Sequence, residues 1–209
     1  PKPTGCKRNK ELPITSRHEI TRADILGIED YAAARPERKR AVAELKKHRR
    51  VAVGPDATFY FESYDTMLHQ VHEMLYIEKG GEQQIEDELR AYNPMIPNGR
   101  ELVATLMFEI DEPVRREKFL AALGGVEETV TLTLNGETIT ATPEHDVDRT
   151  TAEGKASSIQ FLHLAFTDAQ VKKFRTPDAQ VTIAIGHQKY GHLAVLPEAV
   201  RQALAQDFY

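Results

Sequence analysis

The amino-acid sequence predicts an α+β fold, in which a helical N-terminal half packs on a mainly antiparallel sheet formed largely by the C-terminal half. Three observations carry this prediction. Helical periodicity and capping signals dominate up to residue 92, short alternating strands dominate from residue 101, and Asn135-Gly136 marks a tight hairpin. Helices grouped ahead of strands, without regular alternation, are typical of α+β proteins.

The composition indicates one folded domain. A chain of 209 residues with 41% hydrophobic and 28% charged side chains is close to the globular average and long enough to bury a sizeable core. Residues 1–17 are polar and lack hydrophobic periodicity. We therefore expect a flexible N-terminal arm over 1–17 and a single α+β domain over 18–209.

The first elements begin at recognisable start signals. The segment from Thr21 to Asp24 has the form of a capping box and predicts a short helix to about Ala33. Pro36 suits the first turn of a second helix, whose basic side chains face outward. A Gly-Pro-Asp turn then separates two predicted strands, over 51–53 and 57–61.

The remaining elements follow from caps, turns and alternation. Ser63 is placed to cap a helix that runs to about Lys79, and Gly80-Gly81 separates it from another helix that ends at Tyr92. The later part of the chain predicts strands over 102–110, 129–134, 137–141, 159–166 and 181–185, and helices over 113–123, 168–174 and 197–206.

Composition also excludes several classes of protein. The single cysteine, Cys6, excludes an internal disulfide framework, and the chain has no apolar run of about 18 residues that could span a membrane. Because its first residues also lack the apolar region of a secretory signal, we expect a cytoplasmic location. A net charge of −5 and a pI near 5.9 argue against nucleic-acid binding.

Basic side chains are nevertheless concentrated in one segment, between residues 35 and 50. Such runs are most often the solvated face of a helix, but they also form docking surfaces for phosphate groups or acidic partners. The candidate partner surface consists of Arg38, Arg40, Lys46, Lys47, Arg49 and Arg50.

The segment from residue 62 to 78 carries the most informative polar pattern. On a helix, His69 and Glu73 are four residues apart on the side opposite the apolar face, so their side chains could share a metal ion or a proton. Gln70 and His72 lie close by, and iron or zinc would be the expected metals. The alternative is an ordinary solvent-exposed face, since the spacing matches no established zinc or di-iron motif.

Two further segments contain candidate site residues. His187, Tyr190 and His192 lie between a predicted strand and the last helix, where they could bind an anion or a metal, or simply pack around a glycine-containing turn. The polar loop from Pro143 to Ala156 is long enough to be functional or mobile. His163, in an apolar strand, is interpreted as a core histidine.

Six segments carry a resemblance to known proteins: Ile20–Leu26, Arg49–Pro55, Gln70–Leu75, Glu88–Asn93, Arg100–Leu106 and Gly186-His187 with Tyr190. Through them the chain, from about residue 19 to the end, resembles a family of bacterial proteins classed as a domain of unknown function. The family's pattern has an apolar residue at the position of His69 and Gln at that of His72, whereas Gln70 and Glu73 match. The resemblance therefore favours Gln70 and Glu73 over the histidines. It also implies a role beside iron–sulfur oxidoreductases and rubrerythrin-like proteins, in redox or oxidative-stress physiology.

Two hypotheses of function follow. The first is a non-catalytic accessory protein that binds a redox partner through its basic surface. The second is a small metal-binding or ligand-binding protein, or an enzyme, with a site around Gln70 and Glu73.

Overall fold

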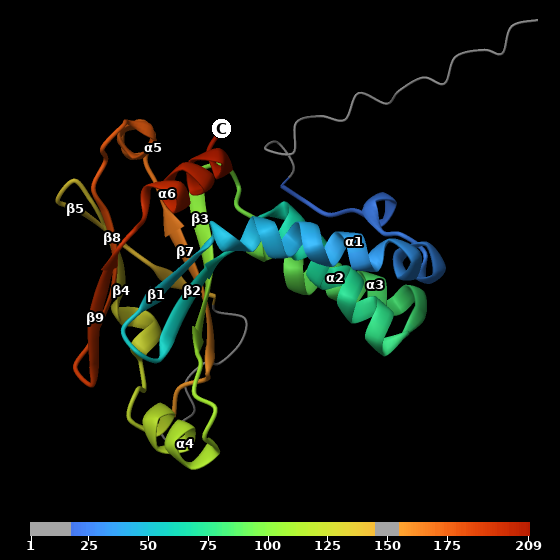
Figure 1. The fold of residues 1–209 in the computed structure, drawn as a ribbon, viewed down its shortest axis with the longest axis horizontal. Helices are drawn as coiled ribbons and strands as arrows, with labels where there is room; N and C mark the ends of the chain where they lie inside the picture. The colour runs from blue at the N-terminus through green and yellow to red at the C-terminus, as the bar shows by residue number, and fades with distance from the viewer. Residues whose placement is uncertain (1–17, 145–154) are drawn as a thin grey trace, which may run out of the picture.

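The computed structural model describes residues 18–144 and 155–209, and the expected α+β class is confirmed (Figure 1). The helices lie mostly in the first half of the chain and the strands mostly in the second. The predicted arm, with Cys6, and most of the polar loop after Pro143 lie outside the described residues. No described helix is long and apolar enough to cross a membrane.

The strands form two antiparallel sheets rather than one. Sheet A has the order β1-β2-β3-β7-β6, and sheet B has the order β5-β4-β8-β9. The strands of sheet A are β1 (Arg50–Val53), β2 (Ala57–Phe61), β3 (Glu101–Phe108), β7 (Ile159–Ala165) and β6 (Thr142–Pro143). Those of sheet B are β5 (Glu137–Thr140), β4 (Val130–Leu134), β8 (Val181–His187) and β9 (Tyr190–Val195).

The main hydrophobic core lies between the two sheets. Every second residue of β2 and β4, and of β8 as far as Ile185, is buried, because a strand turns alternate side chains to opposite faces. Phe59 and Leu106 of sheet A and Leu132 and Ile183 of sheet B are fully buried in one cluster. The helices α5 (Asp168–Arg175) and α6 (Glu198–Leu204) lie at one end of the sheets, and α4 (Pro113–Ala121) lies at the other (Figure 1).

A helical lobe extends from the outer face of sheet A (Figure 1). It consists of α1 (Ile28–Lys47), α2 (Tyr64–Glu78) and α3 (Gly81–Tyr92). Its own core joins Met67, Val71 and Ile85 of the helices to Val103, whose side chain belongs to the outer face of β3. Sheet A is therefore covered on one face by sheet B and partly covered on the other by helices.

The start of the lobe differs from the predicted pair of helices. The capping box at Thr21 is present, but it opens only a single turn of 3-10 helix, Arg22–Asp24. The helix α1 then continues through Pro36 without a break. Proline removes one helical hydrogen bond and leaves the carbonyl of Ala32 without its partner. Since Ala32 and Pro36 are both exposed, water can satisfy that carbonyl.

Other capping and turn predictions are confirmed. The Ser63 hydroxyl accepts a hydrogen bond from the Thr66 amide at 3.3 Å and caps α2. Asn135 and Gly136 both have positive φ and join β4 to β5. A loop was expected after Gly186. The structure instead has the turn and the second strand of the β8–β9 hairpin there. Gly186 and Gly191 face each other in this ladder, so neither glycine interrupts the pairing.

Candidate functional site

The polar side of α2 faces α1 rather than solvent. Tyr31 and Arg35 are four residues apart on α1, as His69 and Glu73 are on α2, so each pair occupies one helix face. The Tyr31 hydroxyl donates to Glu73 Oε1 at 2.7 Å. The Arg35 guanidinium donates to both carboxylate oxygens, from Nε at 2.8 Å and from Nη2 at 2.9 Å. Glu73 is thereby held in a bidentate ion pair between the helices.

The ionisation of this network follows from its contacts. The hydrogen bonds from Arg35 lower the pKa of Glu73 to about 2, and the bond from Tyr31 adds to this against the opposing effect of burial. Burial raises the pKa of Tyr31, and the adjacent Glu73 carboxylate raises it further. Arg35 also lies 4.8 Å from the centre of the Tyr76 ring. The arrangement suits a clamp between α1 and α2 rather than an exposed catalytic carboxylate.

His72, expected as a ligand, is instead buried and engaged through both ring nitrogens. Its Nε2 accepts from the Leu26 amide at 3.0 Å, so Nδ1 carries the proton and donates to the Leu68 carbonyl at 2.8 Å. The ring stacks on Tyr31, with 4.7 Å between centroids. Burial lowers the pKa of His72. His72 is therefore not the metal or ligand contact that the sequence suggested, because both of its ring nitrogens already form hydrogen bonds within the protein.

His69 lies at the edge of the same network. Its Nδ1 is 3.3 Å from the Tyr31 hydroxyl. Burial lowers the pKa of His69, and the neighbouring Lys46, Lys39 and Arg35 lower it further, although Glu73 opposes them. Across residues 18–144 and 155–209, no group of three or more His, Cys, Asp or Glu side chains is arranged to hold a metal ion. Iron or zinc stays a prediction, which elemental analysis of the purified protein would test.

We expect Glu73 to stabilise the protein in a defined acidic range. Its pKa in the folded protein, about 2, lies below the ordinary value of 4.5, so the stabilisation is present above 4.5 and is lost as the pH falls toward 2. Because Arg35 is partly exposed and water screens the pair, the effect should be on the order of 2 kcal/mol. Urea unfolding between pH 6 and pH 3 measures it.

The variant Glu73→Gln should lose this component of the pH dependence. The matched control is Glu44→Gln, since Glu44 pairs with Lys47 but its side chain is 71% exposed. We expect the control to follow the wild-type pH dependence. Identical pH dependence in Glu73→Gln and the wild type would contradict the assignment.

Gln70 belongs to a different site from Glu73. It lines a cavity of about 350 Å³ on the outer face of sheet A, which we call the sheet-A cavity. The cavity lies where α2 and the chain after α3 cover β2, β3 and β7. Its apolar lining consists of Met67, Met95, Met107, Ile159 and Phe161. Its polar lining consists of Lys46, Tyr60, Glu62, Thr66, Gln70, Tyr92 and Thr105.

Glu62 is the most deeply placed charged group of this cavity, and its residue is only 7% exposed. Each carboxylate oxygen accepts one hydroxyl: Oε2 from Thr66 at 2.6 Å and Oε1 from Thr105 at 2.7 Å. The backbone is fixed as well, because the Glu62 amide donates to the Val103 carbonyl at 2.8 Å. Glu62 therefore presents an ordered carboxylate at the junction of β2, β3 and α2.

Gln70 and Tyr92 are further polar residues of the cavity lining. Burial raises the pKa of Tyr92, and the polar side chain of Gln70 opposes that rise. The Gln70 side-chain amide carries a donor and an acceptor, so it adds a hydrogen-bonding group to the cavity lining. The cavity thus combines apolar walls with acceptors on Glu62, Thr105 and Gln70.

Sequence reasoning missed Glu62, Thr66 and Thr105 as one group. One signal was available: Glu62 follows Thr58 and Tyr60 in strict alternation with buried residues, so it belongs to the outer face of β2. The register that places Thr105 opposite Tyr60, beside Glu62, depends on the pairing of β2 with β3. Those strands are separated by two helices, and local patterns do not determine their alignment.

The predicted partner surface is corrected at one position. Arg49 is only 4% exposed, and its guanidinium donates to the Phe61 and Glu62 carbonyls and to the Asp207 carboxylate. Burial raises the pKa of Asp207, although the adjacent Arg49 opposes that rise. Arg49 is thus an internal anchor for the C-terminal segment. Of the remaining five candidates, Arg40, Lys47 and Arg50 are exposed, and Arg38 and Lys46 are half-buried.

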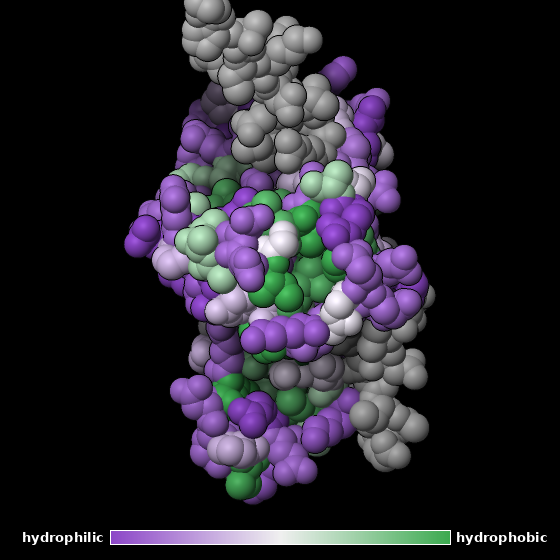
Figure 2. All heavy atoms as spheres, turned by 90° about the vertical axis from the view of Figure 1, so that its right-hand side faces the viewer, coloured by the Kyte–Doolittle hydropathy of each residue, from purple (hydrophilic) through white to green (hydrophobic). Residues whose placement is uncertain are grey.

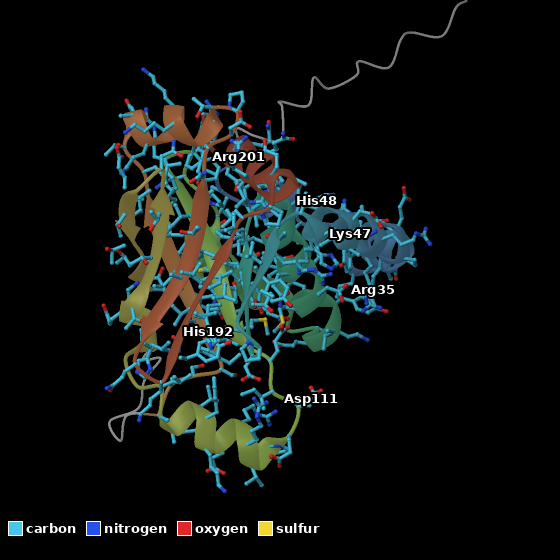
Figure 3. The ribbon with its side chains drawn as sticks, turned by 60° about the vertical axis from the view of Figure 1, so that its left-hand side comes forward. Arg35, Lys47, His48, Asp111, His192 and Arg201 are labelled. Atoms are coloured by element: carbon cyan, nitrogen blue, oxygen red, sulfur yellow. The ribbon has the colours of Figure 1, made fainter. Side chains whose placement is uncertain are left out.

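The second predicted cluster has a packing role. Tyr190 is 3% exposed, and its hydroxyl donates to the Val53 carbonyl at 2.8 Å and accepts from the Asp56 amide at 3.0 Å. Tyr190 is therefore a packing residue and not the ligand contact that the sequence suggested. His187 Nδ1 accepts from the Lys189 amide within the turn. His192 is exposed, with its ring against Tyr190, and lies far from Arg35 of the helical network (Figure 3).

His163 is also corrected, because it is not a core residue. Its ring bridges two carboxylates on the outer face of sheet A, with Nδ1 3.1 Å from Glu101 and Nε2 3.1 Å from Glu144. Hydrogen bonding to Glu101, followed by Glu144, raises the pKa of His163 despite the effect of burial. This bridge ties β3 to β7 and to the residue that follows β6.

One comparison with known proteins shows the family of this chain, and another finds a similar structure. The model of a family described as "Protein of unknown function (DUF3501)" matches residues 19–208. The chain is also similar to a crystal structure of a "novel protein of unknown function" from Burkholderia pseudomallei K96243. The two share 34% sequence identity and a TM-score of 0.84, over 91% of this chain and 99% of that chain. No curated protein matches the chain.

Proposed function

Because this chain belongs to the DUF3501 family of proteins of unknown function, we propose its function from geometry: it binds a small, mainly apolar molecule in the sheet-A cavity. A volume of about 350 Å³ is within the range of ligand pockets. The single observation that carries the proposal is the convergence of Glu62 from the link between β2 and α2, Thr105 from β3 and Gln70 from α2 on a cavity with apolar walls.

The lining supports adaptable binding. Three of the four methionines of the chain, Met67, Met95 and Met107, line the cavity. Methionine side chains are flexible and polarisable, so they adjust to ligands of different outline. Phe161 and the rings of Tyr60 and Tyr92 add flat apolar surface. Polar groups at fixed positions would then orient the ligand, as expected for a binding site.

The methionines provide a direct experiment with an internal control. We expect that a small-molecule probe shifts the ¹³C-methyl NMR signals of Met67, Met95 and Met107, while Met74, on α2 but outside the cavity, is unaffected. The probes are 2-phenylethylamine, 2-phenylethanol and phenylacetate, which share one ring and differ in charge. The filling substitution Ile159→Trp should abolish the shifts. The proposal is wrong if no probe shifts the three methyls, or if Met74 shifts equally.

A second candidate function rests on the basic surface of α1 and β1. Lys39, Arg40 and Arg50 are exposed, and within the described part of the chain no carboxylate lies in ion-pair distance of them. The proposed occupant is an acidic protein, in line with the iron–sulfur oxidoreductase or rubrerythrin-like partner that the family resemblance implies. The lobe also has apolar side chains at its surface, surrounded by hydrophilic ones (Figure 2).

The docking candidate is tested by charge reversal. The triple variant Lys39→Glu, Arg40→Glu, Arg50→Glu should weaken binding to such a purified partner, and higher salt should weaken wild-type binding as well. The control variant Lys118→Glu, Lys172→Glu, Lys189→Glu makes the same change of net charge at other exposed positions. Equal losses in both variants would contradict a specific surface.

A further inference from the structure

We propose that the ligand of the sheet-A cavity carries a primary ammonium group, which pairs with the Glu62 carboxylate. This inference rests on the proposed binding function and specifies the chemistry that the cavity selects. It depends on the surroundings of Glu62, on the acceptors beside it and on the aromatic walls.

Glu62 is a buried carboxylate without a positive partner. Its two oxygens receive hydroxyl protons from Thr66 and Thr105. Within residues 18–144 and 155–209, no nitrogen of Lys, Arg or His lies within 4.0 Å of them. Removing a carboxylate from water costs several kcal/mol unless charge and hydrogen bonds compensate. The partial positive charge at the start of α2 and the two hydroxyl donors offset part of this cost. The remaining cost would be offset by a cation beside the carboxylate.

The nearby cations do not fill this position. The Arg49 guanidinium contacts the backbone carbonyl of Glu62 at 2.7 Å, and its charge is paired with Asp207. Lys46 lines the cavity, but its ammonium is beyond 4.0 Å from the Glu62 oxygens. A charged group of a ligand can therefore approach Glu62 without displacing a pair that the protein already forms.

The acceptors match the donors of a primary ammonium. Such a group has three N–H donors and no acceptor. Glu62 supplies one acceptor, and the Thr105 oxygen supplies a second because its proton is already donated to Glu62. The side-chain carbonyl of Gln70, which also lines the cavity, supplies a third. A carboxylate-bearing ligand would meet repulsion from Glu62, and an alcohol would gain hydrogen bonds but no charge pairing.

The walls also suit an organic cation. Tyr60, Tyr92 and Phe161 line the cavity, and aromatic faces attract cations that have left water. The methionine side chains beside them would contact the apolar remainder of the ligand. The inferred ligand class is a primary amine on a compact apolar or aromatic body.

The test compares probes of equal shape at pH 7, by ¹³C-methionine NMR titration and calorimetry. We expect 2-phenylethylamine, as its ammonium, to bind at least 10-fold more tightly than 2-phenylethanol, and phenylacetate to bind most weakly. Glu62→Gln should lower the affinity for the amine at least 10-fold and change that for the alcohol less than 3-fold. The control Glu117→Gln, which neutralises an exposed carboxylate on α4, away from the cavity lining, should leave both affinities unchanged.

The outcomes separate the two proposals. If the alcohol binds as tightly as the amine, or Glu62→Gln retains full amine affinity, the ammonium inference fails while the binding function stands. If none of the three probes binds in the cavity, the binding function itself fails. The ranking of probes on the wild-type protein decides the inference even if Glu62→Gln does not fold.

Discussion

Replacing Arg49 with Met should lower the free energy of unfolding by about 3 to 5 kcal/mol. Arg49 is 4% exposed and pairs with Asp207, whose side chain is 10% exposed. Removing the guanidinium leaves a buried carboxylate without a partner, together with two carbonyls, of Phe61 and Glu62, that lose their donor. Urea unfolding at pH 7 measures the loss.

The adjacent residue provides the control. Arg50 is exposed, so Arg50→Met should change the free energy of unfolding by no more than about 0.5 kcal/mol. The double variant Arg49→Met, Asp207→Leu should recover part of the stability, because the stranded charge is then removed. Losses of similar size in Arg49→Met and Arg50→Met would show that the buried pair does not anchor the C-terminal segment.

The second large effect is expected at Gly54, in the turn between β1 and β2. Gly54 has φ +73°, and a Cβ atom there would lie 2.6 Å from the Tyr190 hydroxyl and 2.7 Å from the His192 ring. In Gly54→Ala, backbone strain should cost about 1 kcal/mol. Displacement of the buried Tyr190 should cost a further 1 to 3 kcal/mol, roughly. Thermal and urea unfolding measure the total.

Gly136→Ala separates the two contributions. Gly136 also has positive φ, +88°, but a Cβ atom there would meet nothing within 4 Å. We expect this variant to show the strain alone, about 1 kcal/mol. In a Tyr190→Phe background, where the hydroxyl is absent, Gly54→Ala should cost less than in the wild type. Equal effects of Gly54→Ala and Gly136→Ala would rule out the steric contact with Tyr190.

The Arg49 pair also affects the proposed site. Arg49 holds the Glu62 carbonyl, and the Glu62 side chain is the acidic group of the sheet-A cavity. The same residue thus joins the C-terminal segment to the strand end that carries the site. This connection explains how a segment as late as Asp207 contributes to the placement of Glu62.

Much of the fold was predictable because its signals are local. The Ser63 cap bonds to a residue three positions later, and Asn135-Gly136 forms a turn between neighbouring strands. Such interactions form within a few residues and depend little on the rest of the chain. Local signals were misleading at Pro36 and at Gly186. At Pro36 the helix continues because the carbonyl that loses its partner is exposed to water. At Gly186 the hairpin continues because Gly186 pairs with Gly191.

The sequence alone thus determined the class of fold, most elements, and Gln70 and Glu73 as residues to examine. Only the tertiary structure decided their surroundings. Glu73 meets Tyr31 across 42 positions, and Glu62 meets Thr105 across 43. Whether a polar side chain meets water, a counter-charge or a cavity depends on which distant segment packs over it. That packing is set by the combined burial of two cores, and no local pattern encodes it.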